Sequence, residues 1–446
     1  MKITVIGTGY IGLVQGALLS DLGFDVTCFD IDSHKIDLLD KGILPIYEPG
    51  LDEIIESSKK RGTINFSSSC KSSVENADVI FIGVGTPSLS DGSTDLSYIE
   101  NVSACLGQNI KNNCLIITKS TVPVGTNRTI KRIIEENLKL NNRTSDFSII
   151  SNPEFLREGK AVYDCYNPER IVIGIDSHDN QEKIVEKIKI IYKYFIEKNI
   201  PIVFTSLESA ELSKYASNAF LAMKISYINE IALLAEKLNA NVNDVAKIMG
   251  LDSRIGGDFL KAGLGYGGSC FPKDTLSLLN TAKNIGSDLG IIDSVIKTND
   301  YMKEYIINKI IDKVGNIKNK EIAVLGLSFK PGTDDIRESP SINLIRKIIY
   351  KGGHVKVYCP KAMKNARKEL KDLSNFITFT ENEYECTRNA DLIILATEWE
   401  QFKSLDFIKI KDHMHNNYFF DLRNMFINED GIRSLFNYYP VGINYN

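Results

Sequence analysis

Short apolar runs alternate with amphipathic stretches along the first 200 residues. KITVI at 2–6 and FDVTCFD at 24–30 have the composition of strands, and the stretch between them, 11–22, has the spacing of a helix. Further apolar runs that end in small or polar residues occupy 77–87, 113–123, 147–155 and 170–175. Strands that alternate with helices in this way predict a parallel sheet that is covered on both faces.

The pattern changes after Pro201. Neither glycine nor proline occurs again before Gly250, and 206–240 predicts a single helix of roughly 50 Å. A kinked pair of helices is the alternative. Because a helix of that length exceeds the diameter of a small domain, we expect it to bridge two domains and to offer a dimer surface. From about 318 the alternation of strands and helices returns, in KEIAVLGLSF, HVKVYCP, ADLIILATEW and NYFFDLRN.

The sequence therefore predicts an α/β protein with two Rossmann-like, doubly wound parallel-sheet domains joined by a long central helix. We place the first α/β domain at 1–200, a helical region with the long helix at 201–300 and the second α/β domain at 315–446.

Composition narrows the class of protein. The chain has 446 residues, of which 43% are hydrophobic and 25% charged, and its formal net charge is −4. This is typical of a globular, multidomain chain and does not favour nucleic acid as a partner. No apolar run reaches the roughly 18 residues that span a bilayer, and the N-terminus is unlike a signal peptide, so we expect a cytoplasmic protein. The eight cysteines form no CxxC pair, which disfavours a zinc site and a disulfide framework; we predict no metal site.

The motif GTGYIG at 7–12 follows a predicted strand and opens a helix. Such glycines allow a tight turn, close approach of a pyrophosphate and close packing of helix against strand. Asp30 ends the next strand, where a carboxylate can accept hydrogen bonds from a ribose, which favours NAD over NADP. Thr86 and Thr121 follow later strands, where a cofactor binds or where ordinary turns lie. The residues predicted to bind the cofactor are Gly7, Gly9, Tyr10, Ile11, Gly12, Asp30, Lys35, Thr86 and Thr121.

The run GLGYGGSCFPKD at 263–274 places Cys270 after a series of glycines. Pro272 fits the first turn of a helix, so Cys270 is expected at a helix N-terminus, where the helix dipole and Lys273 stabilise a thiolate. Asp274, one turn later, is a candidate base. A buried structural cysteine is the alternative, but the glycine-rich approach favours a nucleophile.

An NAD-linked enzyme with a nucleophilic cysteine can oxidise an aldehyde through a thioester. Lys214 and Asn218 lie four residues apart on the predicted long helix and are candidates to stabilise an oxyanion. Glu154 and Glu158 have the same spacing and are candidates to hold a water. A solvated helix face and a surface ladder are the respective alternatives.

These motifs, in this order, resemble the UDP-glucose/GDP-mannose dehydrogenase family. The resemblance covers essentially the whole chain and rests on GTGYIGLVQGALLSDLGFDVTCFDID, STVPVGT, NPEFLREG, ELSKYASNAFLAMKISYINEIA, SRIGGDFLKAGLGYGGSCFPKD and GLSFKPGTDDIRESPS. It implies NAD as cofactor, UDP-glucose as substrate and a four-electron oxidation of the sugar C6 alcohol, through the aldehyde, to the acid of UDP-glucuronate. It also implies a homodimer.

The resemblance further implies roles for individual residues. Cys270 would form the thioester, Lys214 and Asn218 would stabilise the oxyanion, and Asp274, Thr121 and Glu158 would manage water and protons. Glu158, Lys273 and Arg337 would also contact the cofactor. The substrate would contact Glu154, Phe155, Leu156, Glu158, Lys214, Asn218, Arg254 from the neighbouring subunit, Phe259, Leu260, Lys261, Ala262, Gly263, Gly267, Lys330 and Arg423.

Some alternatives stay open. In the second α/β domain LGLSFKPGTDD lacks the second and third glycines of the dinucleotide motif and HVKVYCP ends without an acid, so we expect it to bind a UDP-sugar rather than a second NAD.

GDP-mannose and UDP-N-acetylmannosamine are alternative substrates. A two-electron hydroxyacid dehydrogenase would share the Rossmann plan but would not need Cys270. A nucleotide-sugar sensor without activity would not need Cys270 or Lys214.

Overall fold

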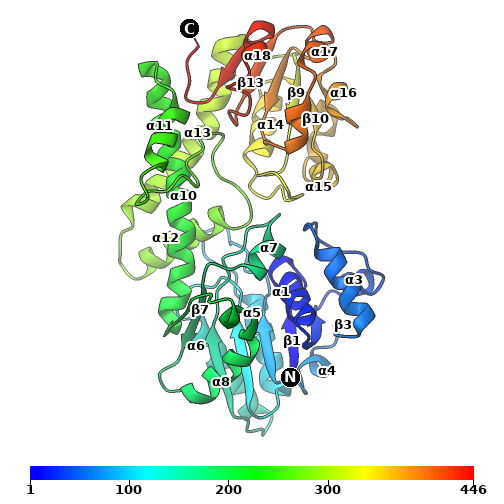
Figure 1. Ribbon diagram of the computed structural model, residues 1–446, viewed down its shortest axis with the longest axis vertical. Helices are drawn as coiled ribbons and strands as arrows, with labels where there is room; N and C mark the ends of the chain where they lie inside the picture. The colour runs from blue at the N-terminus through cyan, green and yellow to red at the C-terminus, as the bar shows by residue number, and fades with distance from the viewer. Residues whose placement is uncertain (446) are drawn as a thin grey trace. The chain divides into compact units, whose positions relative to one another are not determined.

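The computed structural model describes residues 1–445, which form two compact units (Figure 1). The first unit is Met1–Ser217, and the second begins at Asn218. The division falls inside helix α10 (Leu207–Leu238). Over residues 1–445, no helix combines the length and the apolar character that a membrane-spanning segment needs.

The first unit is built on an eight-stranded sheet with the order β3-β2-β1-β4-β5-β6-β7-β8. Its first six strands have the doubly wound order and are parallel to their neighbours, whereas β6 and β7 pair antiparallel over two residue pairs. The strands are β1 (Lys2–Ile6), β2 (Asp25–Phe29), β3 (Ile64–Ser67), β4 (Val79–Ile82), β5 (Cys114–Thr118), β6 (Phe147–Ser151), β7 (Ile171–Ile175) and β8 (Ile202–Ser206).

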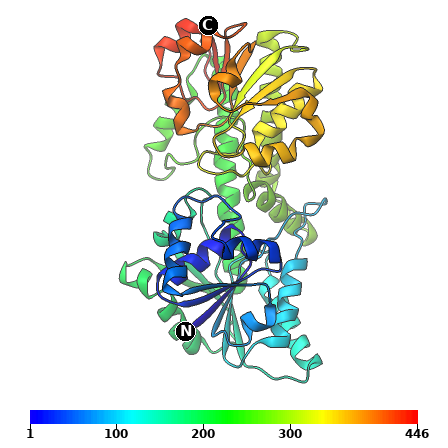
Figure 2. The same cartoon turned by 90° about the vertical axis from the view of Figure 1, so that its right-hand side faces the viewer.

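Helices cover both faces of this sheet (Figure 2). Because successive side chains of a strand point to opposite faces, Val5 and Phe81 pack with α1, α3 and α8, whereas Ile6 and Ile82 pack with α5 and α6. The helices are α1 (Tyr10–Asp21), α2 (Ser33–Asp40), α3 (Leu51–Arg61), α4 (Cys70–Val74), α5 (Ser97–Asn109), α6 (Thr126–Leu140), α7 (Ala161–Tyr166), α8 (Gln181–Ile191) and α9 (Lys193–Glu197).

The second unit contains a six-stranded, wholly parallel sheet with the order β11-β10-β9-β12-β13-β14, which repeats the doubly wound order. Its strands are β9 (Glu321–Leu325), β10 (His354–Tyr358), β11 (Ile377–Phe379), β12 (Leu392–Leu395), β13 (Tyr418–Asp421) and β14 (Asn437–Pro440). Besides the end of α10, the helices are α11 (Val242–Gly250), α12 (Phe271–Asn284), α13 (Gly290–Val314), α14 (Pro340–Tyr350), α15 (Met363–Glu369), α16 (Glu383–Thr387), α17 (Phe407–Asp412) and α18 (Asp430–Leu435).

The predicted fold class, two doubly wound sheets and a long central helix, is confirmed. The long helix is continuous, so the kinked alternative is wrong. One expectation about cysteines also needs correction: Cys70, at the start of α4, and Cys105, in α5, are joined by a disulfide across 35 residues of sequence. The pairing brings together two neighbouring helices, and no local spacing in the sequence indicates it.

Candidate active site

The loop between β1 and α1 has the shape that a dinucleotide needs. Gly7 has a φ of +99°, and a Cβ on Gly12 would lie 1.9 Å from the carbonyl oxygen of Gly7, so both positions require glycine. Gly9 precedes α1 and has open space beside it, and no side chain caps the first turn. The N-terminus of α1, which begins with Tyr10 and Ile11, therefore presents the positive end of its helix dipole beside an open glycine, as a phosphate site requires.

Asp30 lies directly after β2, next to this loop. Its Oδ2 accepts hydrogen bonds from the backbone N and the hydroxyl of Thr8 at 2.9 and 2.7 Å, and Lys35 Nζ lies 3.7 Å away. Burial alone would raise the pKa of Asp30, but hydrogen bonds from Asp32 and Thr8 and the charge of Lys35 hold that pKa below its usual value. The carboxylate is thus ionised and fixed, as recognition of a ribose requires.

Thr86 and Thr121 follow β4 and β5 at the carboxyl edge of the first sheet. Both are buried, and the Thr86 hydroxyl donates to the carbonyl oxygen of Thr121 at 2.8 Å. The structure therefore brings together two residues that the sequence placed separately at strand ends. Doubly wound sheets bind their ligands at this edge.

A buried ion pair joins Glu154, after β6, to Lys214 on α10. Lys214 Nζ lies 3.0 Å from Glu154 Oε1, and both side chains are less than 5% exposed. Glu154 Oε2 also accepts a hydrogen bond from the backbone N of Leu156 at 2.5 Å. A buried charge pair is costly to desolvate and adds little stability by itself, so its position at a ligand-binding edge favours a chemical role.

The ring of Phe155 lies close to two cations. The guanidinium carbon of Arg170 is 3.8 Å from the centre of the ring, and Lys214 Nζ is 5.4 Å from it. The sequence analysis did not identify Arg170, because this residue lies just before β7 and outside every motif. Glu158 is half-buried in the same NPEFLREG segment.

A second lysine, Lys119, also escaped the sequence analysis. It directly follows β5 and is buried. Burial lowers the pKa of Lys119, and the positive charge of Lys214 acts in the same direction while Glu154 opposes it. Its place at the end of a parallel strand, next to Ser120 and Thr121, is the signal that could have identified it.

Cys270 occupies the position before α12, as predicted. It caps a helix that begins at Phe271, and Pro272 lies in the first turn. The Ser269 hydroxyl is 3.5 Å from the Cys270 sulfur. The first turn of the helix therefore places the positive end of its dipole near the thiol.

The other free cysteines differ from Cys270, which is only half-buried. All five are buried. Burial raises to about 12 the pKa of Cys28, Cys114, Cys165 and Cys386. They cannot act as thiolates near neutral pH, so the prediction of a nucleophile at Cys270 fits its surroundings and would not fit theirs.

Asp274, one turn after Cys270, is buried and held from two sides. Asn218 on α10 donates to its Oδ2 at 2.6 Å, and Lys273 Nζ lies 2.6 Å from its Oδ1. The structure thus brings together the predicted base and the predicted oxyanion donor. One amide hydrogen of Asn218 points to Asp274, and its second one is left for another acceptor.

The glycines before Cys270 pack against protein. A Cβ on Gly267 would lie 2.3 Å from the carbonyl oxygen of Glu338 and one on Gly268 would lie 2.7 Å from the ring of Phe329. Gly268 N donates to the carbonyl oxygen of Arg337 at 2.9 Å. The glycines therefore let the segment before Cys270 dock on the loop that follows β9.

Arg423, after β13, belongs to the same neighbourhood. It forms two hydrogen bonds of 2.5 and 3.0 Å with Glu398, and its side chain would meet a Cβ on Gly263 at 3.1 Å. Burial would raise the pKa of Glu398, but the charge of Arg423 and its hydrogen bonds lower it below the usual value. Glu398, in the segment that follows β12, was not predicted as part of the site.

The remaining predicted residues of the second unit are spread along two segments. Phe259 has a φ of +64°, Leu260 and Ala262 are buried and Lys261 is exposed. Lys330 Nζ lies 5.2 Å from the centre of the Phe329 ring. Arg337 and Arg254 are exposed and each pairs with an aspartate two residues before it, Asp335 and Asp252. Among residues 1–445, no three His, Cys, Asp or Glu side chains are grouped as a metal site would be.

Three family models match successive parts of the chain. All three are described as belonging to the UDP-glucose/GDP-mannose dehydrogenase family: the NAD binding domain matches residues 1–196, the central domain 208–301 and the UDP binding domain 323–428.

Individual relatives match over almost the full length. The UDP-glucose 6-dehydrogenase of Rhizobium meliloti is 45% identical over 99% of this chain and 99% of its own. That of Bacillus subtilis is 43% identical over 99% of this chain and 98% of its own. A solved structure of a UDP-glucose dehydrogenase from Pyrobaculum islandicum has 36% identity and a TM-score of 0.90, and the match covers 99% of this chain and 98% of that one.

Proposed function

Because the chain belongs to the UDP-glucose/GDP-mannose dehydrogenase family, we propose that it oxidises the C6 alcohol of UDP-glucose to the carboxylate of UDP-glucuronate. The family resemblance of the motifs is confirmed, and so is NAD as the cofactor of the family's first domain. The observation that carries the proposal is Cys270, a half-buried thiol at the start of α12 in a chain whose other free thiols are buried.

The residues around the first loop fit NAD. Gly9 leaves room beside the N-terminus of α1, and the ionised Asp30 stands next to it for a ribose. When bound, NAD accepts a hydride in each of two oxidations. The overall reaction is therefore UDP-glucose, two NAD⁺ and water giving UDP-glucuronate, two NADH and three protons.

In the first oxidation the C6 hydroxyl loses a proton and a hydride. Lys214 and Asn218, one turn apart on α10, supply an ammonium and an amide N–H that would stabilise the negative charge on the C6 oxygen. Glu154 would hold Lys214 in place through their ion pair. The product of this step is the aldehyde.

In the second oxidation the Cys270 sulfur bonds to the aldehyde carbon and forms a thiohemiacetal. Loss of a hydride from that carbon leaves a thioester on Cys270. Water then attacks the thioester carbon, the carbon–sulfur bond breaks and the thiol is restored. Asp274, with Thr121 and Glu158, would position this water and accept its proton.

The second sheet would hold the UDP-sugar. The docked segment before Cys270, residues Phe259–Ala262, and the ion pair of Arg423 with Glu398 would line the sugar and diphosphate site. Lys330 would approach the substrate, Arg337 the cofactor and Arg254 the substrate of a neighbouring subunit. This assignment gives the chain three parts: NAD binding at 1–200, a helical part at 201–300 and UDP-sugar binding at 315–446.

The test is the amount of NADH formed per UDP-glucose consumed. The parent should give two, and Cys270→Ser should lose steady-state turnover by at least about a thousandfold because the thioester cannot form. Cys359→Ser, which changes a buried cysteine of the second sheet, is the matched control and should keep its turnover.

Other outcomes separate the alternatives. A yield of one NADH per UDP-glucose would contradict the thioester route, and so would an undiminished turnover by Cys270→Ser. Either result would favour a two-electron dehydrogenase. Faster turnover of GDP-mannose or UDP-N-acetylmannosamine than of UDP-glucose would keep the mechanism and change the substrate.

A cytoplasmic homodimer through α10 completes the proposal. Phe220, Tyr227 and Leu234 recur every seventh residue of α10 and are 57%, 47% and 51% exposed. Such an apolar stripe on a helix is typical of a helix–helix interface. Light scattering should give twice the chain mass, and Tyr227→Glu should reduce it to the chain mass; an unchanged mass would place the interface elsewhere.

A further inference from the structure

A cavity lies in the second unit, and none of its lining residues has a part in the proposed reaction. Its volume is about 220 Å³, and it opens between the end of α10, the end of α13 and the last strand with the segment after it. Its lining residues are Glu236, Lys237, Tyr305, Lys309, Lys313, Tyr438, Tyr439, Ile443, Asn444 and Tyr445.

The floor of the cavity is a fixed polar cluster around Glu236. Its carboxylate accepts hydrogen bonds from the Tyr305 hydroxyl at 2.5 Å, from Lys309 Nζ at 2.6 Å and from Gly442 N at 2.8 Å. Lys309 Nζ also donates to the carbonyl oxygen of Pro440 at 2.6 Å, and its side chain is 9% exposed. The buried ammonium is thereby held rigidly in position.

The side chains that line the cavity carry a net positive charge. Lys237 and Lys313 add two exposed ammonium groups, so that the lining carries three lysines against one carboxylate. Burial lowers the pKa of Lys309 below its usual value although Glu236 acts against this shift. An additional anion near these ammonium groups would therefore stabilise their charged forms.

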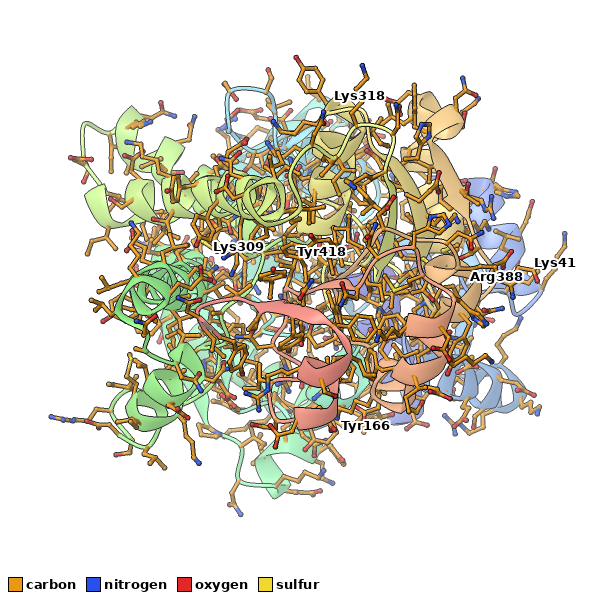
Figure 3. The ribbon with its side chains drawn as sticks, turned by 90° about the horizontal axis from the view of Figure 1, so that it is seen from above. Lys41, Tyr166, Lys309, Lys318, Arg388 and Tyr418 are labelled. Carbon is orange, nitrogen blue, oxygen red and sulfur yellow. A yellow bond between two sulfur atoms is a disulfide. The ribbon has the colours of Figure 1, made fainter. Side chains whose placement is uncertain are left out.

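The walls of the cavity are aromatic. Tyr439 packs face to face against Phe420 and Tyr418, at centroid distances of 4.9 and 6.4 Å, and Lys313 Nζ lies 5.5 Å from the Tyr439 ring. Figure 3 labels Lys309 and Tyr418. Lys309 contacts the last strand, β14, at Pro440, and Tyr418 contacts it at Tyr439. Flat rings beside polar groups are typical of sites that bind a sugar or another ring.

We propose that this cavity binds a small phosphorylated anion of about the size of a sugar phosphate. Its volume of about 220 Å³ is more than an inorganic ion fills, and its lining offers both ammonium groups and aromatic rings. Lys237, Lys313 and the third hydrogen of Lys309 would bind the phosphate, and Tyr439, Tyr445 and Asn444 would contact the organic part. None of the residues that line the cavity belongs to the Gly7–Gly12 loop or to the segment around Cys270.

Titration calorimetry on the full chain tests the proposal, with glucose 6-phosphate as the probe and glucose as its neutral counterpart. Glucose 6-phosphate should bind at a saturable site and glucose should not. The double variant Lys237→Gln/Lys313→Gln should raise the dissociation constant at least about tenfold, because two cations next to a dianion are lost. A thermal melt of each variant shows that its fold is intact.

Lys364→Gln/Lys411→Gln is the matched control, since it removes two exposed lysines from α15 and α17 of the same unit. Its dissociation constant should equal that of the parent. Equal binding by both double variants, equal binding of glucose and glucose 6-phosphate, or no saturable binding up to about 10 mM would each overturn the proposal.

Discussion

The two sheets share a strand order and part of a loop. Gly7 and Gly326 both follow the first strand of their sheet, with φ values of +99° and +94°. Each donates its N–H to the last residue of the neighbouring strand, Gly7 to Phe29 at 2.7 Å and Gly326 to Tyr358 at 2.8 Å. Up to this point the two loops are the same structure.

The loops then diverge. In the first sheet α1 begins three residues after Gly7, whereas in the second sheet the corresponding helix, α14, begins only at Pro340. Asp30 directly follows β2, whereas Cys359 occupies the equivalent position after β10. The thiol of Cys359 is buried and 3.8 Å from the Ser328 hydroxyl. The doubly wound order therefore fixes where a ligand site lies, and the residues after the first glycine decide which nucleotide fits.

The largest effect should come from closing the tight turn of the first loop. Gly12→Ala places a Cβ 1.9 Å from the Gly7 carbonyl oxygen, so α1 must move away from the turn. We expect NADH binding, measured by NADH fluorescence, to weaken at least about a hundredfold. Pro331→Ala, at the same distance in sequence from Gly326, should leave it unchanged. If Gly12→Ala bound NADH normally, the close packing at Gly12 would not be what distinguishes the first loop from the second.

A smaller effect should follow from removing the carboxylate. Asp30→Asn should raise the KM for NAD by about ten- to a hundredfold, since a hydrogen bond to a charged group is lost, and should leave the KM for UDP-glucose unchanged. Cys359→Ser, its counterpart in the second sheet, should change neither constant. Steady-state kinetics with each substrate varied in turn measures both; an equal rise in the two KM values for Asp30→Asn would contradict a specific role toward the cofactor.

The smallest effect concerns acid stability, where the two sheets should respond with opposite sign. The pKa of Asp30 is lowered in the fold, whereas burial raises the pKa of Asp421 at the end of β13. Asp30 therefore contributes stability that is present above the unfolded pKa of about 4 and is lost as the pH falls through its folded pKa. Asp421 contributes stability below about pH 4 that is lost as the pH rises through its raised folded pKa.

Melting temperatures between pH 3 and 6 measure this difference. We expect a change of a few degrees, since 1 kcal/mol corresponds to about 2–4 °C. The deficit of Asp30→Asn relative to the parent should grow as the pH rises from about 3, and that of Asp421→Asn should shrink as the pH rises from about 4. Deficits that change in the same direction would contradict the opposite pKa shifts.

The sequence pattern predicted the inner strands and missed the outer ones. The four strands absent from the sequence analysis, β3, β8, β11 and β14, are the four edges of the two sheets. A central strand is buried on both faces and is mostly apolar, as CLIIT in β5 is, whereas an edge strand such as β3, INFS, is short and partly polar. Such a short, mixed stretch has no apolar pattern that distinguishes it from a loop.

The candidate site shows the same limit. The glycine turn, Asp30 and the helix that starts after Cys270 follow from local rules about φ, strand ends and helix caps, and the sequence indicated all of them. The contacts of Arg170 with Phe155 and of Glu398 with Arg423 join segments that lie at the ends of different strands. Such pairs depend on the topology of the sheet, which a single sequence does not contain.

The burial of the other free thiols makes the protein selective toward alkylating reagents. A thiol with a pKa of about 12 is ionised to less than about one part in ten thousand at neutral pH. Among the cysteines of residues 1–445, with Cys70 and Cys105 joined to each other, Cys270 is the one whose thiol is both reduced and partly open to solvent. A fluorophore or spin label coupled to the native chain would therefore attach at the proposed reaction centre, without any cysteine having to be removed first.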